Sequence, residues 1–396
     1  MPAASGAGQS APGDSAPGES ALGQPAILVL EDGTTFRGTA FGAAGETFGE
    51  MVFNTGMTGY QETLTDPSYC RQIVAMTAPH IGNTGVNDTD PESRRIWVSG
   101  YVVREPARIA SNWRSQRSLD AELLAQGITG IAVTGTRALT RHLRDRGAMR
   151  AGISAVTTDP DALRERVLAS PQMVGADLAR EVSTATPYTV DPPDGVPVRY
   201  RVAAIDLGIK TATPLAMARR GGQVTVLPAA SSIEEILATR PDGVFFSNGP
   251  GDPAAAGYAV QAVRGVLGRG VPVFGICLGS QVLGRALGLG TYKLRFGHRG
   301  VNQPVKDLAT GQVQITSHNH GFAVAMPPGA EAGTVFETDF GPARISHVNL
   351  NDGVVEGLRL LERPAFSVQY HPEAAPGPHD AAGLFDDFCA LMEAAR

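Results

Sequence analysis

The stretch VPVFGICLGSQVLGRALG, residues 271–288, decides how the second half of this chain folds. It begins as an unbroken apolar run, which is typical of a strand buried on both faces of a sheet. From Leu278 onward the apolar residues take a helical spacing, so the pattern predicts a strand that passes directly into a helix. One of only three cysteines among the 396 residues, Cys277, stands at that turn between two glycines.

This position favours a nucleophilic role for Cys277. The first turn of a helix has unpaired N–H groups and the positive end of the helix dipole, and both favour a thiolate. A thiolate is a far stronger nucleophile than a thiol. Gly275 and Gly279 would relieve crowding at the turn, as the glycines of the G-x-S-x-G elbow do in hydrolases. Free cysteine is often a small core residue, but that alternative does not explain the flanking glycines.

A second motif late in the chain supplies a candidate base. The strand-like run AFSVQY, residues 365–370, is followed by His371-Pro372-Glu373. Residues i and i+2 of an extended backbone point the same way, so the His371 imidazole and the Glu373 carboxylate are expected to converge. A nucleophile needs such a base, and the base needs a group that orients it. Taken alone, His-Pro-Glu could equally be a surface loop.

The pattern around these motifs predicts a sheet covered by helices. From Tyr200 onward, strand-like runs alternate with helical ones, which is typical of a parallel sheet with helices on both faces. Ligands of such folds collect at the carboxyl ends of the strands. Cys277 falls there, and so does the loop SNGPGDP, residues 247–253, whose glycines allow close backbone approach. Together with the N–H of Leu278, that loop could stabilise a developing oxyanion.

The first half of the chain has a different character and indicates a separate domain. Short strand-like runs, including a hairpin around Asp32-Gly33, precede capped helical patterns and predict a mixed α+β domain over residues 26–182. Residues 183–199 are rich in Pro, Thr and Asp and are predicted to link it to a second domain at 200–396. Residues 1–25 contain no Lys or Arg and are predicted to form a disordered tail.

Composition excludes several classes of function. The formal charge of −6 argues against nucleic acid or an anionic membrane as the main partner. No apolar run approaches the roughly 18 residues of a membrane helix. Three cysteines without a signal peptide favour a reducing cytoplasm. None of the three lysines follows a glycine, so the chain has no P-loop for ATP.

Taken together, G-I-C-L-G, S-N-G-P-G-D-P and H-P-E resemble the class I, or triad, glutamine amidotransferases. Within that family, further stretches resemble the small subunits of carbamoyl-phosphate synthetase. They are LEDGTTFRGTAFG, GEMVFNTGMTGYQETLTDPSY, GNTGVND, LRFGHRGVNQPVKD, NHGFAV and HPEAAPGPHDAA. The resemblance extends from about Ala26 to the end. It implies an α/β fold in which an N-terminal domain precedes an amidotransferase domain with a doubly wound, mostly parallel sheet.

The resemblance also implies a reaction. Cys277 would attack the side-chain amide of L-glutamine, with His371 as general base and then acid, and with Glu373 orienting it. Ammonia would pass to a large subunit that makes carbamoyl phosphate from bicarbonate and ATP for arginine and pyrimidine synthesis. No cofactor or metal is implied in this chain, because ATP and its metal ions belong to the large subunit. The residues that match the family's glutamine site are Ser68, Gly249, Gly251, Leu278, Gln281, Asn319, Gly321 and Phe322.

Two positions depart from the family pattern. Ser280 stands where many members have histidine, and His318 stands where glutamine is common. Neither belongs to the triad, so the departures leave local hydrogen bonding in the pocket open. The other cysteines, Cys70 and Cys389, are interpreted as packing residues.

Three rival interpretations stay open. The histidines His318, His320, His371 and His379 could belong to a metal hydrolase, although no H-E-x-x-H accompanies them. A non-catalytic subunit that resembles an amidotransferase would be expected to lack a triad member, whereas all three are present. An amidotransferase of another synthase, such as those for anthranilate or GMP, would lack the N-terminal stretches quoted above.

Overall fold

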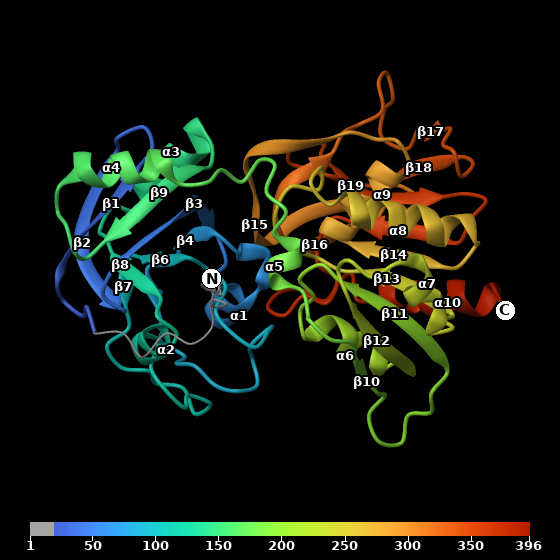
Figure 1. The fold of residues 1–396 in the computed structure, drawn as a ribbon, viewed down its shortest axis with the longest axis horizontal. Coiled ribbons are helices and arrows are strands. Elements are labelled where there is room, and N and C mark those ends of the chain that lie inside the picture. Colours follow the sequence, from blue (N-terminus) through green and yellow to red (C-terminus); the bar gives the residue numbers. More distant parts are fainter. Residues whose placement is uncertain (1–19) are drawn as a thin grey trace, which may run out of the picture.

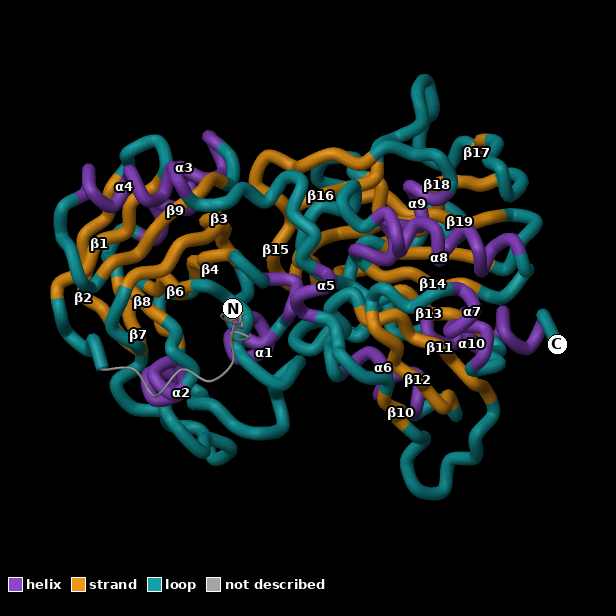
Figure 2. Tube along the Cα trace, viewed as in Figure 1, coloured by secondary structure: helices purple, strands orange, loops and turns teal. Residues whose placement is uncertain are grey.

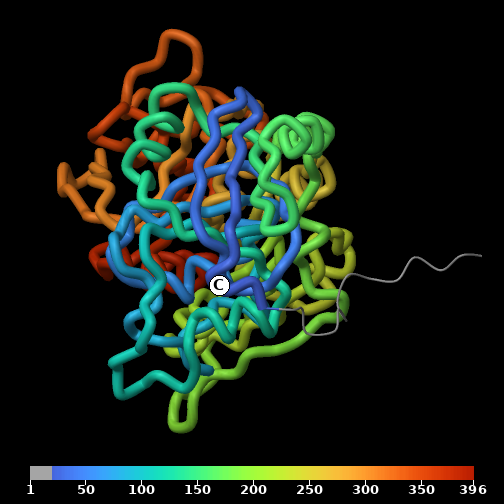
Figure 3. The backbone as a smooth tube through the Cα atoms, turned by 90° about the vertical axis from the view of Figure 1, so that its left-hand side faces the viewer, coloured from blue at the N-terminus to red at the C-terminus, as the bar shows by residue number. Residues whose placement is uncertain are grey.

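The first domain is built on a closed barrel of strands. In the computed structural model, which describes residues 20–396, these strands follow the order β1-β2-β8-β6-β4-β3-β9. Their bounds are β1 (Pro25–Leu30), β2 (Thr35–Gly42), β3 (Glu46–Asn54), β4 (Gln72–Met76), β6 (Gly100–Val103), β8 (Thr129–Ala132) and β9 (Met149–Ser154). The predicted hairpin around Asp32-Gly33 is confirmed and runs along the front of the domain in Figure 3. The strands β3, β4, β6 and β8 pair in parallel, and the sequence pattern did not predict this closure.

Short helices surround the barrel. They are α1 (Tyr60–Thr65), the 3₁₀ turn η1 (Pro67–Tyr69), α2 (Leu119–Ala125), α3 (Thr136–Arg146) and α4 (Pro160–Ala169), with the small strand pair β5 (His80–Ile81) and β7 (Glu105–Pro106). Two of these helices have clear cap residues: the Asp159 side chain accepts two backbone N–H groups at the start of α4, and Gly147 ends α3 with φ +106°. The turn η1 lies against strand β16 of the second domain.

Both predicted boundaries need correction. Of the tail predicted over residues 1–25, residues 1–19 lie outside the described part of the chain. Within the described part, Ser20 forms a bridge with Ala43 and Ala21 is fully buried, so residues 20–25 belong to the fold. The predicted linker 183–199 contains strand β10 (Tyr188–Val190), which pairs with the second sheet, and it follows the short helix α5 (Ala179–Val182). A three-residue edge strand among prolines is too short to leave a periodic signal.

The second domain contains one large mixed sheet, which lies beside the barrel (Figure 1). Its parallel centre follows the order β12 (Gly222–Pro228), β11 (Tyr200–Asp206), β13 (Gly243–Phe246), β14 (Val273–Ile276) and β20 (Ala365–Val368). This centre matches the predicted alternation. Beyond β20 the pairing becomes antiparallel through β19 (Val355–Leu360), β18 (Ala343–Asn349), β15 (Thr291–Asp307) and β16 (Val313–Val324), with β17 (Val335–Phe336) beside β18. That antiparallel half departs from the mostly parallel sheet that was expected.

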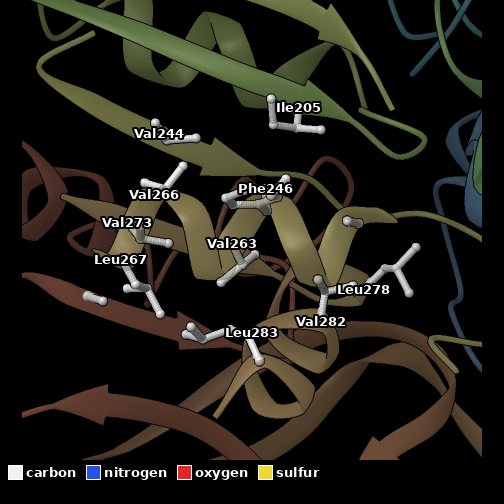
Figure 4. Close-up of a cluster of buried hydrophobic side chains, with 14 of the residues drawn as sticks. Ile205, Val244, Phe246, Val263, Val266, Leu267, Val273, Leu278, Val282 and Leu283 are labelled. Atoms are coloured by element: carbon white, nitrogen blue, oxygen red, sulfur yellow. The ribbon is translucent and has the colours of Figure 1, made fainter. Parts of the chain in front are cut away.

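Helices cover both faces of the parallel centre, as predicted. On one face lie α7 (Ile233–Ala238), α8 (Gly257–Gly268) and α9 (Leu278–Ala286), and on the other α6 (Ala212–Ala218) and α10 (Leu384–Ala394). Val244 and Phe246 pack with α8 and α9 in the core of Figure 4, whereas Phe245 faces α10. This alternation follows from the period of two in a strand.

The two domains meet along β15 and β16, whose strands reach toward the barrel in Figure 2. The backbone N–H of Thr55, which follows β3, bonds to the carbonyl of Arg299 on β15 at 3.3 Å. Within the described residues 20–396, no helix is both long and apolar enough to cross a membrane.

Candidate active site

Cys277 occupies a strained corner between β14 and α9. It is the N-cap of α9, with φ +54° and ψ −104°, a backbone conformation that non-glycine residues rarely adopt. A Cβ added to Gly279 would lie 2.1 Å from the carbonyl oxygen of Phe246, and one added to Gly275 would lie 2.7 Å from that of Gly279. Both glycines are therefore required by close backbone approach. Strain of this kind persists where the surrounding structure over-determines it.

His371 and Glu373 leave the carboxyl end of the neighbouring strand β20. Because β14 and β20 are parallel, with Ile276 opposite Val368, the imidazole and the thiol arrive at the same edge of the sheet. Nδ1 of His371 lies 2.7 Å from Oε1 of Glu373, so the carboxylate holds the tautomer that leaves Nε2 free to accept a proton. The expected convergence of these two side chains is therefore present.

The buried imidazole is poised as a base. Nε2 of His371 has no well-formed hydrogen bond within residues 20–396. Burial alone would lower the pKa of His371, but the Glu373 carboxylate and the nearby Cys277 thiol raise it to about 10. The thiol Sγ itself contacts the carbonyl oxygen of Asn319 at 3.6 Å. A strongly basic imidazole favours transfer of the thiol proton to Nε2.

A buried lysine that the sequence analysis overlooked completes this group. Nζ of Lys210 lies 2.9 Å from Oε1 of Glu373 and 3.6 Å from Oε1 of Glu92. Burial would raise the pKa of Glu373, but Lys210 and His371 hold it well below its usual range. Burial raises the pKa of Glu92 to about 7, against the opposing effect of Lys210. Two features of the sequence could have pointed to Lys210. It lies just past the carboxyl end of β11, where ligands collect in such sheets, and it is one of only three lysines.

A small cavity beside Cys277 brings together residues from both domains. It is lined by most of the residues expected to bind glutamine, namely Ser68, Gly249, Gly251, Gln281, Asn319, Gly321 and Phe322. Leu278 is the exception, because its side chain packs in the core and only its backbone N–H, in the first turn of α9, could serve the site. A Cβ on Gly249 would lie 1.9 Å from the carbonyl oxygen of Leu207, so this loop is also closely packed.

Hydrogen bonds orient the polar groups of this cavity. Nε2 of Gln281 donates to the Phe322 carbonyl at 2.8 Å and to Gln369 Oε1 at 3.0 Å, which leaves the amide oxygen of Gln281 to accept from a ligand. Nδ2 of Asn248 donates to Ser68 Oγ at 3.0 Å.

The domain contact also positions Asn319. Its Nδ2 donates to Asp66 Oδ2 at 2.9 Å. Asp66 and Ser68 both belong to the region of η1 in the first domain, so that domain helps to form the cavity. Asp66, Asn248 and Gln369 were not foreseen, because their partners are distant in sequence.

Two charged side chains of opposite sign also line the cavity and were not predicted. Arg299 is buried, which lowers its pKa, and its Nη1 donates to the Phe296 carbonyl at 2.7 Å. A Cβ on Gly321 would lie 3.2 Å from Nη2 of Arg299, so the glycine leaves room for the guanidinium. Glu50, on β3 of the first domain, forms an ion pair with Lys293, on β15 of the second domain. A lining with both charges is complementary to an α-amino acid.

The two departures from the family pattern are accommodated inside the protein. Oγ of Ser280 bonds to Oγ of Ser367 on β20 at 2.9 Å. His318 is buried and bonds through Nε2 to Oγ1 of Thr316 at 2.8 Å. The hydroxyl and the imidazole therefore have partners within the fold.

The four histidines considered for a metal hydrolase, His318, His320, His371 and His379, do not form one site in the structure. His379 is exposed, and His371 pairs with Glu373. His318 and His320 lie instead in a buried group with His298 and Glu356.

The other cysteines are placed as packing residues. Burial raises the pKa of Cys70 to about 11 and also raises that of Cys389, which lies on α10 and packs against the core. Neither thiol is activated.

Comparison with known proteins matches two family descriptions to the chain. Residues 28–153 match the carbamoyl-phosphate synthase small chain, CPSase domain, and residues 203–391 match glutamine amidotransferase class-I. The carbamoyl phosphate synthase small chain of Streptomyces coelicolor is 64% identical over 374 residues, which cover 94% of this chain and 97% of that protein. That of Streptomyces avermitilis has the same identity and coverage. That of Mycolicibacterium paratuberculosis is 60% identical over 375 residues, which cover 94% and 99%.

Proposed function

The chain belongs to the family of carbamoyl-phosphate synthase small chains, and we propose that its Cys277, His371 and Glu373 hydrolyse L-glutamine to glutamate and ammonia. The observation that supports this assignment is the pair of adjacent strand ends, which presents a strained cysteine on β14 and a carboxylate-held imidazole on β20. Neither group needs a conformational change to reach the same edge of the sheet.

The reaction begins with proton transfer. Nε2 of His371 accepts the Cys277 thiol proton, and the thiolate attacks the side-chain carbonyl carbon of glutamine. The N–H groups of Leu278 and Gly251 stabilise the resulting oxyanion, because Gly251 lines the cavity and the Leu278 N–H lies in the first turn of α9, directly after Cys277. His371 then donates its proton to the amide nitrogen, the C–N bond breaks, and ammonia leaves a γ-glutamyl thioester. Water, deprotonated by His371, attacks the thioester carbonyl carbon. The C–S bond then breaks, glutamate is released, and the Cys277 sulfur takes the proton back from His371.

Recognition of the substrate uses the two charges of the cavity. The guanidinium of Arg299 binds the α-carboxylate, and the carboxylate of Glu50 and the amide oxygen of Gln281 receive the α-ammonium group. Ser68, held by Asn248, adds a hydroxyl from the first domain.

A second small cavity beside His371 provides a route for the product. His371, Lys210 and Asp66 are among its lining residues, and it shares Asn319 with the glutamine cavity. Ammonia released beside His371 leaves through this polar space toward a large synthetase subunit, which combines it with bicarbonate and ATP. ATP and its metal ions bind to that subunit, and the three unpaired cysteines of this chain suit a reducing cytoplasm.

A glutaminase assay with and without the large subunit tests this function. We expect weak glutamate release from the chain alone, strong stimulation by the large subunit, and loss of both on treatment with a glutamine-like thiol alkylator. A chelator should not abolish glutamine hydrolysis, because the triad reaction uses no metal. Activity that survives the alkylator but not the chelator would refute the cysteine mechanism. Copurification with a chorismate- or nucleotide-using partner would favour the amidotransferase of another synthase.

A further inference from the structure

Beside the glutamine cavity, whose wall includes His320, lies a buried group of four side chains, which we call the histidine cluster. It consists of His298 on β15, His318 and His320 on β16, and Glu356 on β19. One nitrogen or oxygen atom from each of the four lies within 4.8 Å of the other three. All four residues are buried, and none of them has a role in the chemistry described above.

Three of the distances between these atoms are close to the edge length of a tetrahedral metal site. Nδ1 of His298 lies 3.5 Å from Oε1 of Glu356, and Nδ1 of His318 lies 3.8 Å from the same oxygen. Nδ1 of His318 lies 3.2 Å from Nε2 of His320. Zinc bonds to nitrogen and oxygen are about 2.0–2.2 Å long, so the edges of a zinc tetrahedron are roughly 3.3–3.5 Å.

The other ring nitrogens are held by partners outside the cluster. Nε2 of His298 bonds to Asp352 Oδ2 at 2.8 Å, and Nδ1 of His320 bonds to the Phe322 carbonyl at 2.9 Å. Nε2 of His318 bonds to Oγ1 of Thr316, whose own hydroxyl donates to the Gln303 carbonyl. With these N–H groups directed at partners outside the cluster, the second nitrogen of each imidazole is left with a lone pair inside it. Metal-binding histidines are oriented in this way by carboxylates and carbonyls.

The inner atoms lack the partners that buried polar atoms normally have. Within the described residues, Nδ1 of His298 and Oε2 of Glu356 make no hydrogen bond, although both side chains are more than nine-tenths buried. Because the outward contacts take the N–H groups of His318 and His320, Nδ1 of His318 and Nε2 of His320 both carry lone pairs. These two nitrogens face each other at 3.2 Å. Unpaired buried groups are costly, so the arrangement calls for a cation.

We propose that the histidine cluster binds one Zn²⁺ through His298, His318, His320 and Glu356. Three imidazoles and a carboxylate form a ligand set that suits zinc, and four protein ligands leave no open position, as in structural sites. A proton on Nδ1 of His298 is the alternative cation. Such a proton would reach Oε1 of Glu356, which already accepts from Nδ2 of Asn349, but it would leave the lone pairs of His318 Nδ1 and His320 Nε2 facing each other at 3.2 Å.

The ion would stabilise the antiparallel half of the sheet, because its ligands come from β15, β16 and β19. Asn319 lies between two of these ligands, and its carbonyl contacts Cys277. The zinc site would thereby hold in place the strand that forms one wall of the glutamine cavity, without taking part in the triad reaction.

Metal analysis of the full-length chain tests the proposal. The purified protein is dialysed against a chelator, then against Zn²⁺ or Co²⁺, and the bound metal is measured by mass spectrometry. We expect about one ion per chain, a higher Tm after zinc is restored, and the intense visible bands of four-coordinate Co²⁺. A wild-type chain that takes up no stoichiometric metal would overturn the proposal, and so would an octahedral Co²⁺ spectrum.

Substitutions identify the ligands. His318→Gln and Glu356→Gln, which are close in size to the native side chains, should each remove the stoichiometric metal and the Co²⁺ bands. His347→Gln is the matched control, because His347 is buried on neighbouring β18 but lies outside the cluster. The control should retain about one ion. Retention of the metal by the Glu356→Gln and His318→Gln variants would place it elsewhere and refute the assignment.

Discussion

Nζ of Lys210 lies 2.9 Å from Oε1 of Glu373, the same oxygen that accepts the Nδ1–H of His371 at 2.7 Å. Lys210 follows the carboxyl end of β11, whereas the triad residues follow β14 and β20, so three strands contribute to the ion-pair network. The lysine keeps the buried carboxylate ionised, and the ionised carboxylate keeps the imidazole basic. Lys210 is therefore a positioning residue, which acts through Glu373.

Replacing Lys210 with methionine should weaken the triad. Loss of the ammonium group leaves Glu92 and Glu373 buried without their cation, and breaking a buried ion pair costs about 3–5 kcal/mol. We expect a lower Tm, and an acidic limb of the glutaminase pH profile that moves to higher pH, because Glu373 becomes easier to protonate. Lys306→Met, which changes a partly exposed lysine, is the control. An unchanged pH profile would show that Lys210 does not act through Glu373.

Replacing Cys277 with serine should separate the two nitrogen sources of the assembled enzyme. A hydroxyl is a much weaker nucleophile here, so glutamine-dependent synthesis should fall on the order of 10⁴–10⁶-fold. Ammonia-dependent synthesis with the large subunit should persist, since it bypasses the cysteine. Both rates are measured on the same preparation, and equal loss of the two would contradict the assigned division of labour.

Replacing Arg299 with glutamine should mainly raise the KM for glutamine. A hydrogen bond to a charged group is worth about 1.5–3 kcal/mol, which corresponds to roughly a 10- to 100-fold change. Steady-state kinetics should show a smaller effect on kcat, because we propose that the guanidinium binds the α-carboxylate and not the reacting amide. Arg295→Gln, at an exposed position of the same strand, serves as the control. A loss confined to kcat would rule out this role.

Replacing Gly279 with alanine should destabilise the corner that holds Cys277. The new methyl group would lie 2.1 Å from the Phe246 carbonyl oxygen, and overpacking of this kind costs about 1–3 kcal/mol. Gly257→Ala at the start of α8 has no atom within 4 Å of the added carbon and should leave stability unchanged or slightly higher. Denaturant unfolding measures both, and equal stability of the two variants would contradict the close approach.

Stability should depend on pH through His371. Its pKa rises from 6.5 to about 10 on folding, so the native state binds the proton more tightly than the unfolded chain. The resulting stabilisation is fully present below about pH 6.5 and is lost as the pH rises toward 10. Denaturant unfolding across this window should give a falling free energy for the wild type and a flatter curve for His371→Gln. Equal slopes for the two proteins would be evidence against the raised pKa.

The site could be predicted from the sequence where the signal was local. The strand-to-helix turn at Cys277 and the spacing of His371 and Glu373 follow from the geometry of a few consecutive residues. Lys210 and Arg299 were missed because their roles come from packing between segments that lie far apart in the chain. The same reason explains the histidine cluster, whose ligands His298 and Glu356 meet only after β15, β16 and β19 have assembled.

The fold was predictable to a similar extent. The strands in the parallel centre of the second sheet alternate regularly with helices along the chain. The start of α7 is also recognisable locally, because Ser232 and Glu235 form a capping box. The barrel of the first domain closes through parallel pairs such as β4 with β6, whose register no local pattern encodes. The edge strand β10, Tyr188–Val190, is too short for its periodicity to be read.

The glutamine cavity is assembled across the domain boundary by Asp66 with Asn319 and by Ser68 with Asn248. The triad, in contrast, lies wholly within the second domain. A rigid displacement of the barrel would open the substrate wall while the hydrolytic groups kept their spacing. The affinity for glutamine would then depend on how the two domains are positioned relative to each other. A partner protein that binds the barrel could therefore change the affinity for glutamine without touching the triad.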